Sequence, residues 1–187
     1  MQARLPGGRV VLVAESFSGP LAILVAVQCT RVVGVVLSTT FLEPPLSGLL
    51  ALLPKLLPTW AWNQPPPEFL VRALLAGGDP ALAAALRQVM LEVSGKVVAE
   101  RVTAVLRVNV TAEFKKLRCP VLCLQAGRDR LVGARNSARM RAVKPDAEFA
   151  QIDGPHLLLQ ARPREVWLHV SPFLERIARS VPLQCDP

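Results

Sequence analysis

The stretch from residue 10 to 22 constrains the fold of this chain more than any other segment. An apolar run, Val10–Ala14, ends just before Ser16, and a second apolar run with helical spacing follows Gly19. This order predicts a β-strand, a tight turn and an α-helix. A strained backbone holds a serine at such a corner above the end of the sheet, and the helix aims its free N–H groups toward it. The corner therefore suits a nucleophilic serine.

The residues that flank Ser16 have the small size that a doubled-back backbone requires. In Ala14-Glu15-Ser16-Phe17-Ser18, small residues stand two places before and two places after the serine, and Gly19 comes one place later. Bulky side chains at these positions would collide. From this stretch alone, an ordinary strand-to-helix turn in which Ser16 or Ser18 caps the helix is the alternative interpretation.

The other apolar runs predict an α/β fold with a short, mainly parallel sheet of about four strands flanked by helices. Strands are expected at 9–14, 31–38, 120–127 and 147–152. The Val-Val-Leu-Val run of the first strand predicts burial on both of its faces. The first strand, a helix at 17–28 and the second strand make a βαβ unit of about 30 residues. Further helices are expected near 134–143 and from Pro163 onward.

A helical insertion is expected between the second and third strands, over about 41–110. Its first part, 41–67, is rich in proline, leucine and tryptophan, which favours short broken helices that cannot all face inward. Such a segment would form a lid over an apolar pocket, an element on a membrane surface or a dimer contact. Helices near 68–76, 80–93 and 96–108 follow. The apolar positions of the second of these helices are expected in a core: Leu82, Leu86, Val89 and Val93.

The composition narrows the class of protein. With 187 residues, of which 51% are hydrophobic, the chain can bury one substantial core, and we expect a single domain over 1–187. No uninterrupted apolar run approaches the roughly 18 residues of a membrane span, so none is expected. Aromatic residues make up only 5%, and the net charge of +8 is spread along the chain. Both features argue against a nucleic-acid partner.

The cysteines do not group into a metal site or a disulfide pattern. They stand at positions 29, 119, 123 and 185. Cys119 and Cys123 share a strand face but lie about 13 Å apart at 3.3 Å per residue, which is too far for a shared metal or a bridge. Isolated thiols predict a cytoplasmic protein.

Three chemically different side chains follow the predicted carboxyl ends of strands. Ser16 follows the first strand, Asp129 follows the third, and His156 follows the fourth in a Gly-Pro turn. Open α/β sheets bind their ligands at this edge, so we expect the three to meet. A serine becomes nucleophilic when an imidazole takes its proton and a carboxylate holds the other ring nitrogen. The only other histidine, His169, is expected on a helix surface.

Three motifs in the order serine, acid, histidine resemble the α/β-hydrolase superfamily, in particular its esterase/lipase-like serine hydrolases. Ala-Glu-Ser16-Phe-Ser-Gly resembles the nucleophile elbow, Gln-Ala-Gly-Arg-Asp129-Arg-Leu-Val the acid turn, and Asp-Gly-Pro-His156-Leu-Leu-Leu-Gln the histidine loop. The resemblance implies an α/β-hydrolase fold in which the insertion at 41–110 is the cap.

The resemblance also implies a function. It predicts a serine hydrolase that cleaves small-molecule carboxylic esters with an apolar acyl group, with no cofactor and no metal ion. Ser16 would be the nucleophile, Asp129 the acid and His156 the base, and the Phe17 N–H would bind the oxyanion. Glu43, which follows the second strand, is the substitute acid if Asp129 only caps its helix.

The sequence departs from the family at its beginning. The family's early strands, and the His-Gly loop with a second oxyanion donor, have no counterpart before residue 9. The elbow strand would then be a sheet edge, and we expect a homo-oligomer through this edge strand or the lid. A weak or inactive module that binds a partner protein or a lipid is the alternative function. A third interpretation is a fragment that works beside a missing N-terminal half.

Overall fold

The sheet contains four strands in the part of the chain that the structure, a computed structural model, describes: residues 7–45 and 59–180. The strands are β1 (Val10–Glu15), β2 (Val32–Ser38), β3 (Val121–Ala126) and β4 (Glu148–Ile152). They are all parallel and lie side by side in the order of the sequence. This confirms the α/β fold and the short parallel sheet expected from the apolar runs.

The register brings the carboxyl ends of the strands to one edge. Glu15 pairs with Ser38, and Ser38 pairs with Leu124. At the far side of the sheet, Ala126 pairs with Ile152. The turns that follow the strands therefore open on the same side of the molecule, as a parallel sheet requires.

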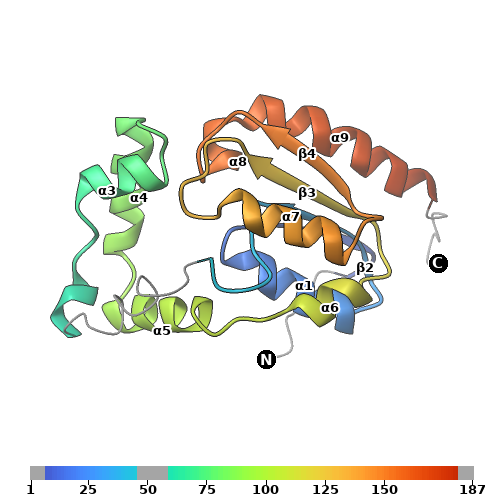
Figure 1. Cartoon of the computed structure of the whole chain (residues 1–187), viewed down its shortest axis with the longest axis horizontal. Helices are drawn as coiled ribbons and strands as arrows, with labels where there is room; N and C mark the ends of the chain where they lie inside the picture. The colour runs from blue at the N-terminus through green and yellow to red at the C-terminus, as the bar shows by residue number, and fades with distance from the viewer. Residues whose placement is uncertain (1–6, 46–58, 181–187) are drawn as a thin grey trace.

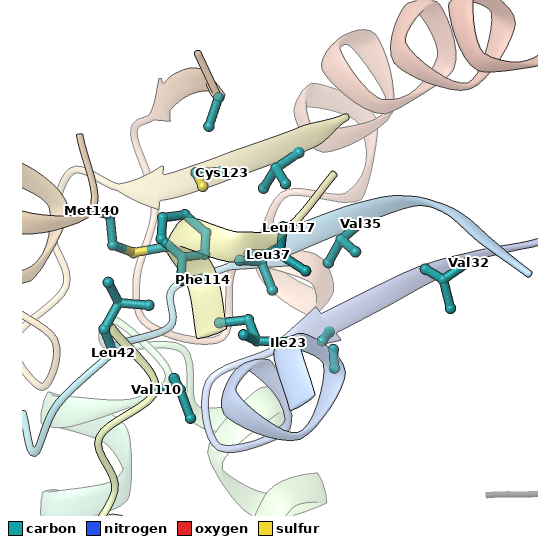
Figure 2. Packing of buried hydrophobic residues seen from close by; sticks show 14 residues of the cluster. Ile23, Val32, Val35, Leu37, Leu42, Val110, Phe114, Leu117, Cys123 and Met140 are labelled. Atoms are coloured by element: carbon teal, nitrogen blue, oxygen red, sulfur yellow. The ribbon is translucent and has the colours of Figure 1, made fainter. Parts of the chain in front are cut away.

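Helices cover both faces of the sheet. On one face lie α1 (Ser18–Gln28), α6 (Thr111–Lys116) and α7 (Ala134–Val143). Figure 2 shows Ile23 of α1, Phe114 of α6 and Met140 of α7 packed over Leu37 and Cys123 of the sheet. The helix α6 was not predicted from the sequence, because it is only six residues long.

The other face packs against α8 (Leu158–Ala161) and α9 (Pro163–Ser180). Four apolar residues of α9 at helical spacing are buried: Val166, Val170, Phe173 and Ile177. They meet Val36, Leu122 and Leu124 of the sheet in a second core. His169 is exposed, as expected for the helix surface. None of the described helices is long and apolar enough to cross a membrane.

Of the helical elements described between β2 and β3, all except α6 lie to one side of the sheet (Figure 1). They are η2 (Thr59–Asn63), α3 (Glu68–Leu74), α4 (Pro80–Leu91) and α5 (Gly95–Val105). Val71, Ala76 and Ala83 form a small core between α3 and α4. The leucines expected in a lid, from Leu46 to Leu57, lie outside the described residues.

Two expectations about burial are wrong. Val13 of β1 is 55% exposed, although the first strand was expected to be buried on both faces. The reason is that β1 is the edge strand, while α9 packs against β2, β3 and β4. Val89 of α4 is 57% exposed, because the small core beside α3 covers only part of its apolar stripe.

Candidate active site

Ser16 stands at the sharp corner between β1 and α1. Its φ angle is 52°, in the left-handed region that costs a residue with a side chain some strain. The Ser16 N–H donates to the Ser38 carbonyl at 2.9 Å, and the Thr40 hydroxyl donates to the Ser16 carbonyl at 2.7 Å. The loop after the neighbouring strand therefore holds the corner in its strained conformation.

Gly19 explains why a small residue is needed one place later than the usual pattern. A Cβ at Gly19 would lie 1.9 Å from the Thr40 Oγ1 atom, and its other close neighbours are also Thr40 side-chain atoms. Ser18 does not need to be glycine here, because its hydroxyl turns back to the Glu15 backbone, accepting from the N–H at 2.9 Å and donating to the carbonyl at 2.7 Å.

Asp129 is held by the turn after β3. Its Oδ1 atom accepts hydrogen bonds from the N–H groups of Leu131 and Val132, both at 2.8 Å. Its Oδ2 atom lies 2.8 Å from His156 Nδ1. The two backbone donors fix the plane of the carboxylate, so the second oxygen points at the imidazole.

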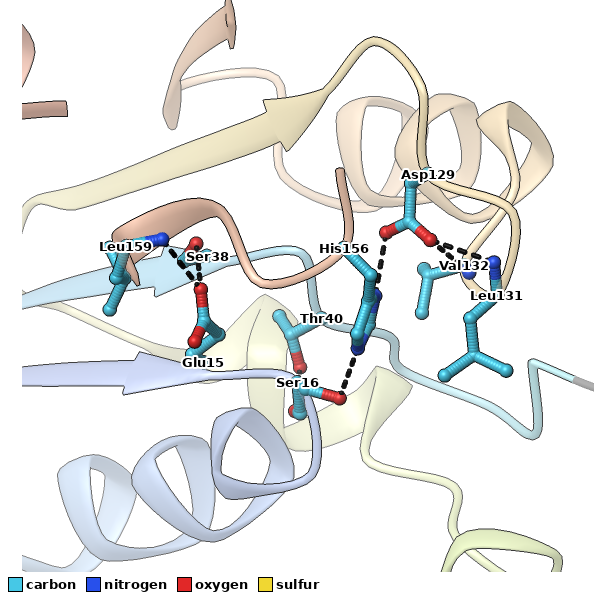
Figure 3. A network of polar contacts seen from close by, with 9 residues as sticks. All are labelled: Glu15, Ser16, Ser38, Thr40, Asp129, Leu131, Val132, His156 and Leu159. Carbon is cyan, nitrogen blue, oxygen red and sulfur yellow. Dashed lines mark hydrogen bonds and ion pairs between the residues drawn. The ribbon is translucent and has the colours of Figure 1, made fainter. Parts of the chain in front are cut away.

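His156 joins the acid to the serine. His156 Nε2 lies 2.7 Å from Ser16 Oγ, and Figure 3 shows the three side chains in a continuous line. The His156 and Asp129 side chains are only 2% and 3% exposed. An imidazole with its proton on Nδ1 donates to Asp129 and accepts from the Ser16 hydroxyl, which is the arrangement a general base needs.

The matching family model is that of the alpha/beta hydrolase family, over residues 1–167. The chain belongs to this family. Membership of the family supports a hydrolase activity. The α/β-hydrolase resemblance that the three motifs carried is thereby confirmed. A comparison with curated proteins found no match.

Solved structures with the same fold include three enzymes of different kinds. A thermophilic esterase from Thermogutta terrifontis has a TM-score of 0.74 and 22% identity, covering 91% of this chain and 66% of its own. A bromoperoxidase from Bacillus anthracis has a TM-score of 0.75 and 17% identity, and the match covers 90% of this chain and 68% of the bromoperoxidase. An enol-lactonase from Burkholderia xenovorans LB400 has a TM-score of 0.73 and 16% identity, and the match covers 90% of this chain and 66% of the lactonase. The chain thus spans about two thirds of these hydrolase-fold proteins.

Of the two other predicted site residues, Glu43 does not contact the imidazole and Phe17 adjoins Ser16. The Glu43 carboxylate accepts hydrogen bonds from Arg139 at 2.5 Å and from Thr111 at 3.3 Å, while the imidazole contacts Asp129 instead. Phe17 follows the serine directly, at the N-terminal end of α1. Within the described residues, no hydrogen bond occupies the Phe17 N–H.

Glu15 was missed as a site residue by the sequence analysis. Its Oε1 atom accepts hydrogen bonds from the Ser38 hydroxyl at 3.2 Å and from the Leu159 N–H at 2.9 Å (Figure 3). Ser38 is completely buried. No local pattern could have identified this contact, because Leu159 is 144 residues away in the sequence.

Among the residues that the structure describes, the titratable groups outside the Ser16 site do not gather into a metal centre. The described residues contain no group of three or more histidine, cysteine or carboxylate side chains that could hold a metal ion. Cys123 is buried in the sheet, and this burial raises the pKa of its thiol to about 12. Such a thiol packs as a small apolar side chain and stays protonated.

Proposed function

We propose that this chain is a serine hydrolase that cleaves carboxylic esters with an apolar acyl group. The observation that carries the proposal is the unbroken line of hydrogen bonds from Ser16 Oγ through His156 to Asp129, at 2.7 and 2.8 Å. Membership of the alpha/beta hydrolase family supports it. Ser16 is the nucleophile, His156 the general base and Asp129 the orienting acid.

In the first half of the reaction, Ser16 Oγ attacks the ester carbonyl carbon and its proton moves to His156 Nε2. The carbonyl oxygen becomes an oxyanion, and the Asp129 carboxylate stabilises the imidazolium across the Nδ1 hydrogen bond. The tetrahedral intermediate then collapses. The bond to the alcohol oxygen breaks, His156 returns the proton to that oxygen, and an acyl-serine remains.

The second half repeats these steps with water. His156 takes a proton from a water molecule, whose oxygen attacks the acyl carbon, and the carboxylic acid leaves as Ser16 regains its proton. The enzyme is regenerated and the ester has become an acid and an alcohol. The reaction requires no cofactor.

The Phe17 N–H is the proposed oxyanion donor. It follows the nucleophile at the start of α1, so the positive end of the helix dipole lies on the same side. One donor of this kind contributes about 10²–10³ to the rate. With a single assigned donor, we expect modest turnover. The same feature favours the alternative of a module that binds a lipid or a protein without turning it over.

The proposed preference for an apolar acyl group follows from the cap. The helices from η2 to α5 are the proposed cap, and Leu75 of this region contacts the histidine loop by accepting a hydrogen bond from the Leu157 N–H at 3.1 Å. The cap sequence is rich in leucine, and a leucine-rich cap that contacts the histidine loop favours an acyl chain over a charged acid.

The test is hydrolysis of p-nitrophenyl esters with short and medium acyl chains. Ser16→Ala and His156→Ala should each abolish turnover, whereas the surface variants Ser171→Ala and His169→Ala should match the unmodified chain. A fluorophosphonate probe should label Ser16 only when His156 is present. Equal rates in all four variants, or no labelling at all, would overturn the proposal, and the second result would favour the binding module.

A further inference from the structure

A pocket lies between the cap and the acid turn. It has a volume of about 660 Å³. One wall comes from α3 and the turn after it, with Phe69, Arg72 and Gly77, and the other comes from Arg128 and Arg130. The last two residues flank Asp129 in the sequence, so this wall of the pocket belongs to the acid turn.

The pocket carries more positive than negative charge. Arg128 is paired with Asp153 at 2.8 Å. The Arg72 Nε donates to the Gly78 carbonyl at 2.7 Å, which leaves its terminal nitrogens for another acceptor. Within the described residues, no carboxylate pairs with Arg72 or with Arg130.

The carboxylate that lines this pocket does not cancel that charge. Glu68 is paired with Arg87, at 3.5 Å, and Arg87 is not a lining residue. Two guanidinium groups, those of Arg72 and Arg130, therefore line the pocket without an ion-pair partner among the described residues. Guanidinium forks bind carboxylates and phosphates with paired, charge-assisted hydrogen bonds. The Phe69 ring, which is 68% exposed, adds an apolar surface beside them.

The pocket lies on the histidine side of the Ser16 site. A Cβ at Gly77 would lie 2.6 Å from the Cβ of Pro155, the residue before His156, and Gly77 has a φ of 62° that favours glycine. The turn after α3 therefore packs directly on the histidine loop. In ester hydrolysis, the histidine delivers its proton to the alcohol oxygen, so the alcohol part of the substrate leaves on this side.

We propose that this pocket binds an anionic group, a carboxylate or a phosphate, on the alcohol part of the ester substrate. This inference rests on the proposed esterase function and adds the charge of the substrate to it. The acyl part stays apolar. Arg72 and Arg130 supply the binding charge, and Phe69 packs against the carbon skeleton next to the anion.

The test compares two esters that differ by one para carboxylate, phenyl butyrate and 4-carboxyphenyl butyrate, by release of the phenol, with each rate divided by that of the uncatalysed hydrolysis of the same ester. The unmodified chain should prefer the charged ester in kcat/KM by at least about tenfold, as expected for charge-assisted hydrogen bonds. Arg72→Gln and Arg130→Gln should remove this preference, which is measured in each variant as the ratio of kcat/KM for the two esters. The matched control is Arg164→Gln, an exposed arginine of α9, which should keep the preference.

A binding arm decides the inference even if neither ester is hydrolysed. Titration calorimetry with 4-hydroxybenzoate, and separately with inorganic phosphate, should show binding that weakens at least about tenfold in the Arg72→Gln and Arg130→Gln variants. Binding of one probe only would identify the anion. Equal kcat/KM for the two esters, or binding of the probes that neither variant changes, would overturn the inference. Absence of all turnover together with intact binding of the probes would overturn only the esterase function.

A second inference comes from Glu15, on an independent observation. Its carboxylate receives the Leu159 N–H at 2.9 Å and the hydroxyl of the buried Ser38 at 3.2 Å. Leu159 lies three residues after His156, at the start of α8, and Glu15 immediately precedes Ser16. One side chain thus ties the turn of the nucleophile to the loop of the base.

We infer that Glu15 is a positioning residue that sets the distance between His156 Nε2 and Ser16 Oγ. Without the carboxylate, the Leu159 N–H would lose its acceptor and the histidine loop would lose its anchor to the elbow. A displacement of about 1 Å in such a pair can cost about 10²-fold in rate. The Glu15 carboxylate is hydrogen-bonded to Ser38 and Leu159, whereas Ser16 Oγ is hydrogen-bonded to His156.

The test uses Glu15→Ala and Glu15→Gln, since the glutamine keeps an oxygen that can accept from Leu159. With kcat referred to titrated active sites, the alanine variant should fall at least about tenfold at unchanged KM, and the glutamine variant should recover most of that loss. The control is Glu100→Ala, an exposed glutamate of α5. A kcat per site equal to that of the unmodified chain in Glu15→Ala would refute this role, even if the melting temperature falls.

A spectroscopic readout makes the second test independent of turnover. The proton shared by His156 Nδ1 and Asp129 should give a downfield proton NMR signal, which Glu15→Ala should broaden or shift and Glu15→Gln should keep. An identical signal in all three proteins would show that Glu15 does not position the imidazole.

Discussion

The substitution Asp129→Asn tests the proposed role of the acid, because the structure dictates how the new amide must lie. In the unmodified chain, Oδ1 accepts from the Leu131 and Val132 N–H groups at 2.8 Å, and Oδ2 faces His156 Nδ1 at 2.8 Å. If the asparagine keeps its oxygen on the two backbone donors, its NH2 group faces the imidazole. His156 must then accept on Nδ1 and carry its proton on Nε2.

The opposite orientation of the amide is unfavourable. It would place the NH2 group against two backbone N–H donors and would break two hydrogen bonds, at about 1 kcal/mol each. This difference of at least about 2 kcal/mol keeps roughly 97% of the molecules in the first orientation. An imidazole with its proton on Nε2 points that proton at Ser16 Oγ and cannot accept the hydroxyl proton. We therefore expect kcat to fall by about 10⁴, as in triads held in the wrong tautomer.

The assay is hydrolysis of p-nitrophenyl butyrate, with a thermal melt of each variant. Asp79→Asn is the matched control, because Asp79 also accepts two backbone N–H bonds, from Ala81 at 2.8 Å and Leu82 at 3.1 Å, but is not the carboxylate that contacts His156. Asn caps a helix about as well as Asp, so both variants should keep the fold. An Asp129→Asn variant within tenfold of the unmodified chain would refute the proposed role.

Three other changes test the fold around the site. Gly19→Ala should destabilise the chain by about 1–3 kcal/mol in urea unfolding, because its Cβ collides with Thr40; in a Thr40→Gly background, where that side chain is gone, the same change should be neutral or stabilising. Iodoacetamide at pH 8 should leave Cys123 unmodified in the folded chain and modify it in urea, because burial raises the pKa of the thiol to about 12; labelling of the folded chain would contradict this. Asp146→Asn should lower the melting temperature at neutral pH, because the hydrogen bond from the buried Lys144 lowers the pKa of Asp146. That stability is present above the ordinary carboxyl pKa and is lost as the pH falls through the lowered one, so the difference between the two proteins should disappear in strong acid.

The sequence alone was sufficient for the features that depend on neighbouring residues. Strand, turn and helix around Ser16 follow from apolar spacing and small residues within a few positions of each other, and the same holds for the buried stripe of α9. The order of Ser16, Asp129 and His156 along the chain was also enough to indicate the family. The strand-turn-helix and the stripe of α9 are local signals, because they depend only on residues a few positions apart.

Only the tertiary structure decided which segments meet. Whether Asp129 or Glu43 faces the imidazole depends on packing, which directs Glu43 to Arg139 instead. The exposure of Val13 depends on how far α9 reaches across the sheet, and the bond from Glu15 to Leu159 joins residues 144 positions apart. Such contacts leave no trace in local spacing, because any of several polar or apolar residues could satisfy them. The fold selects one partner by bringing its backbone into reach.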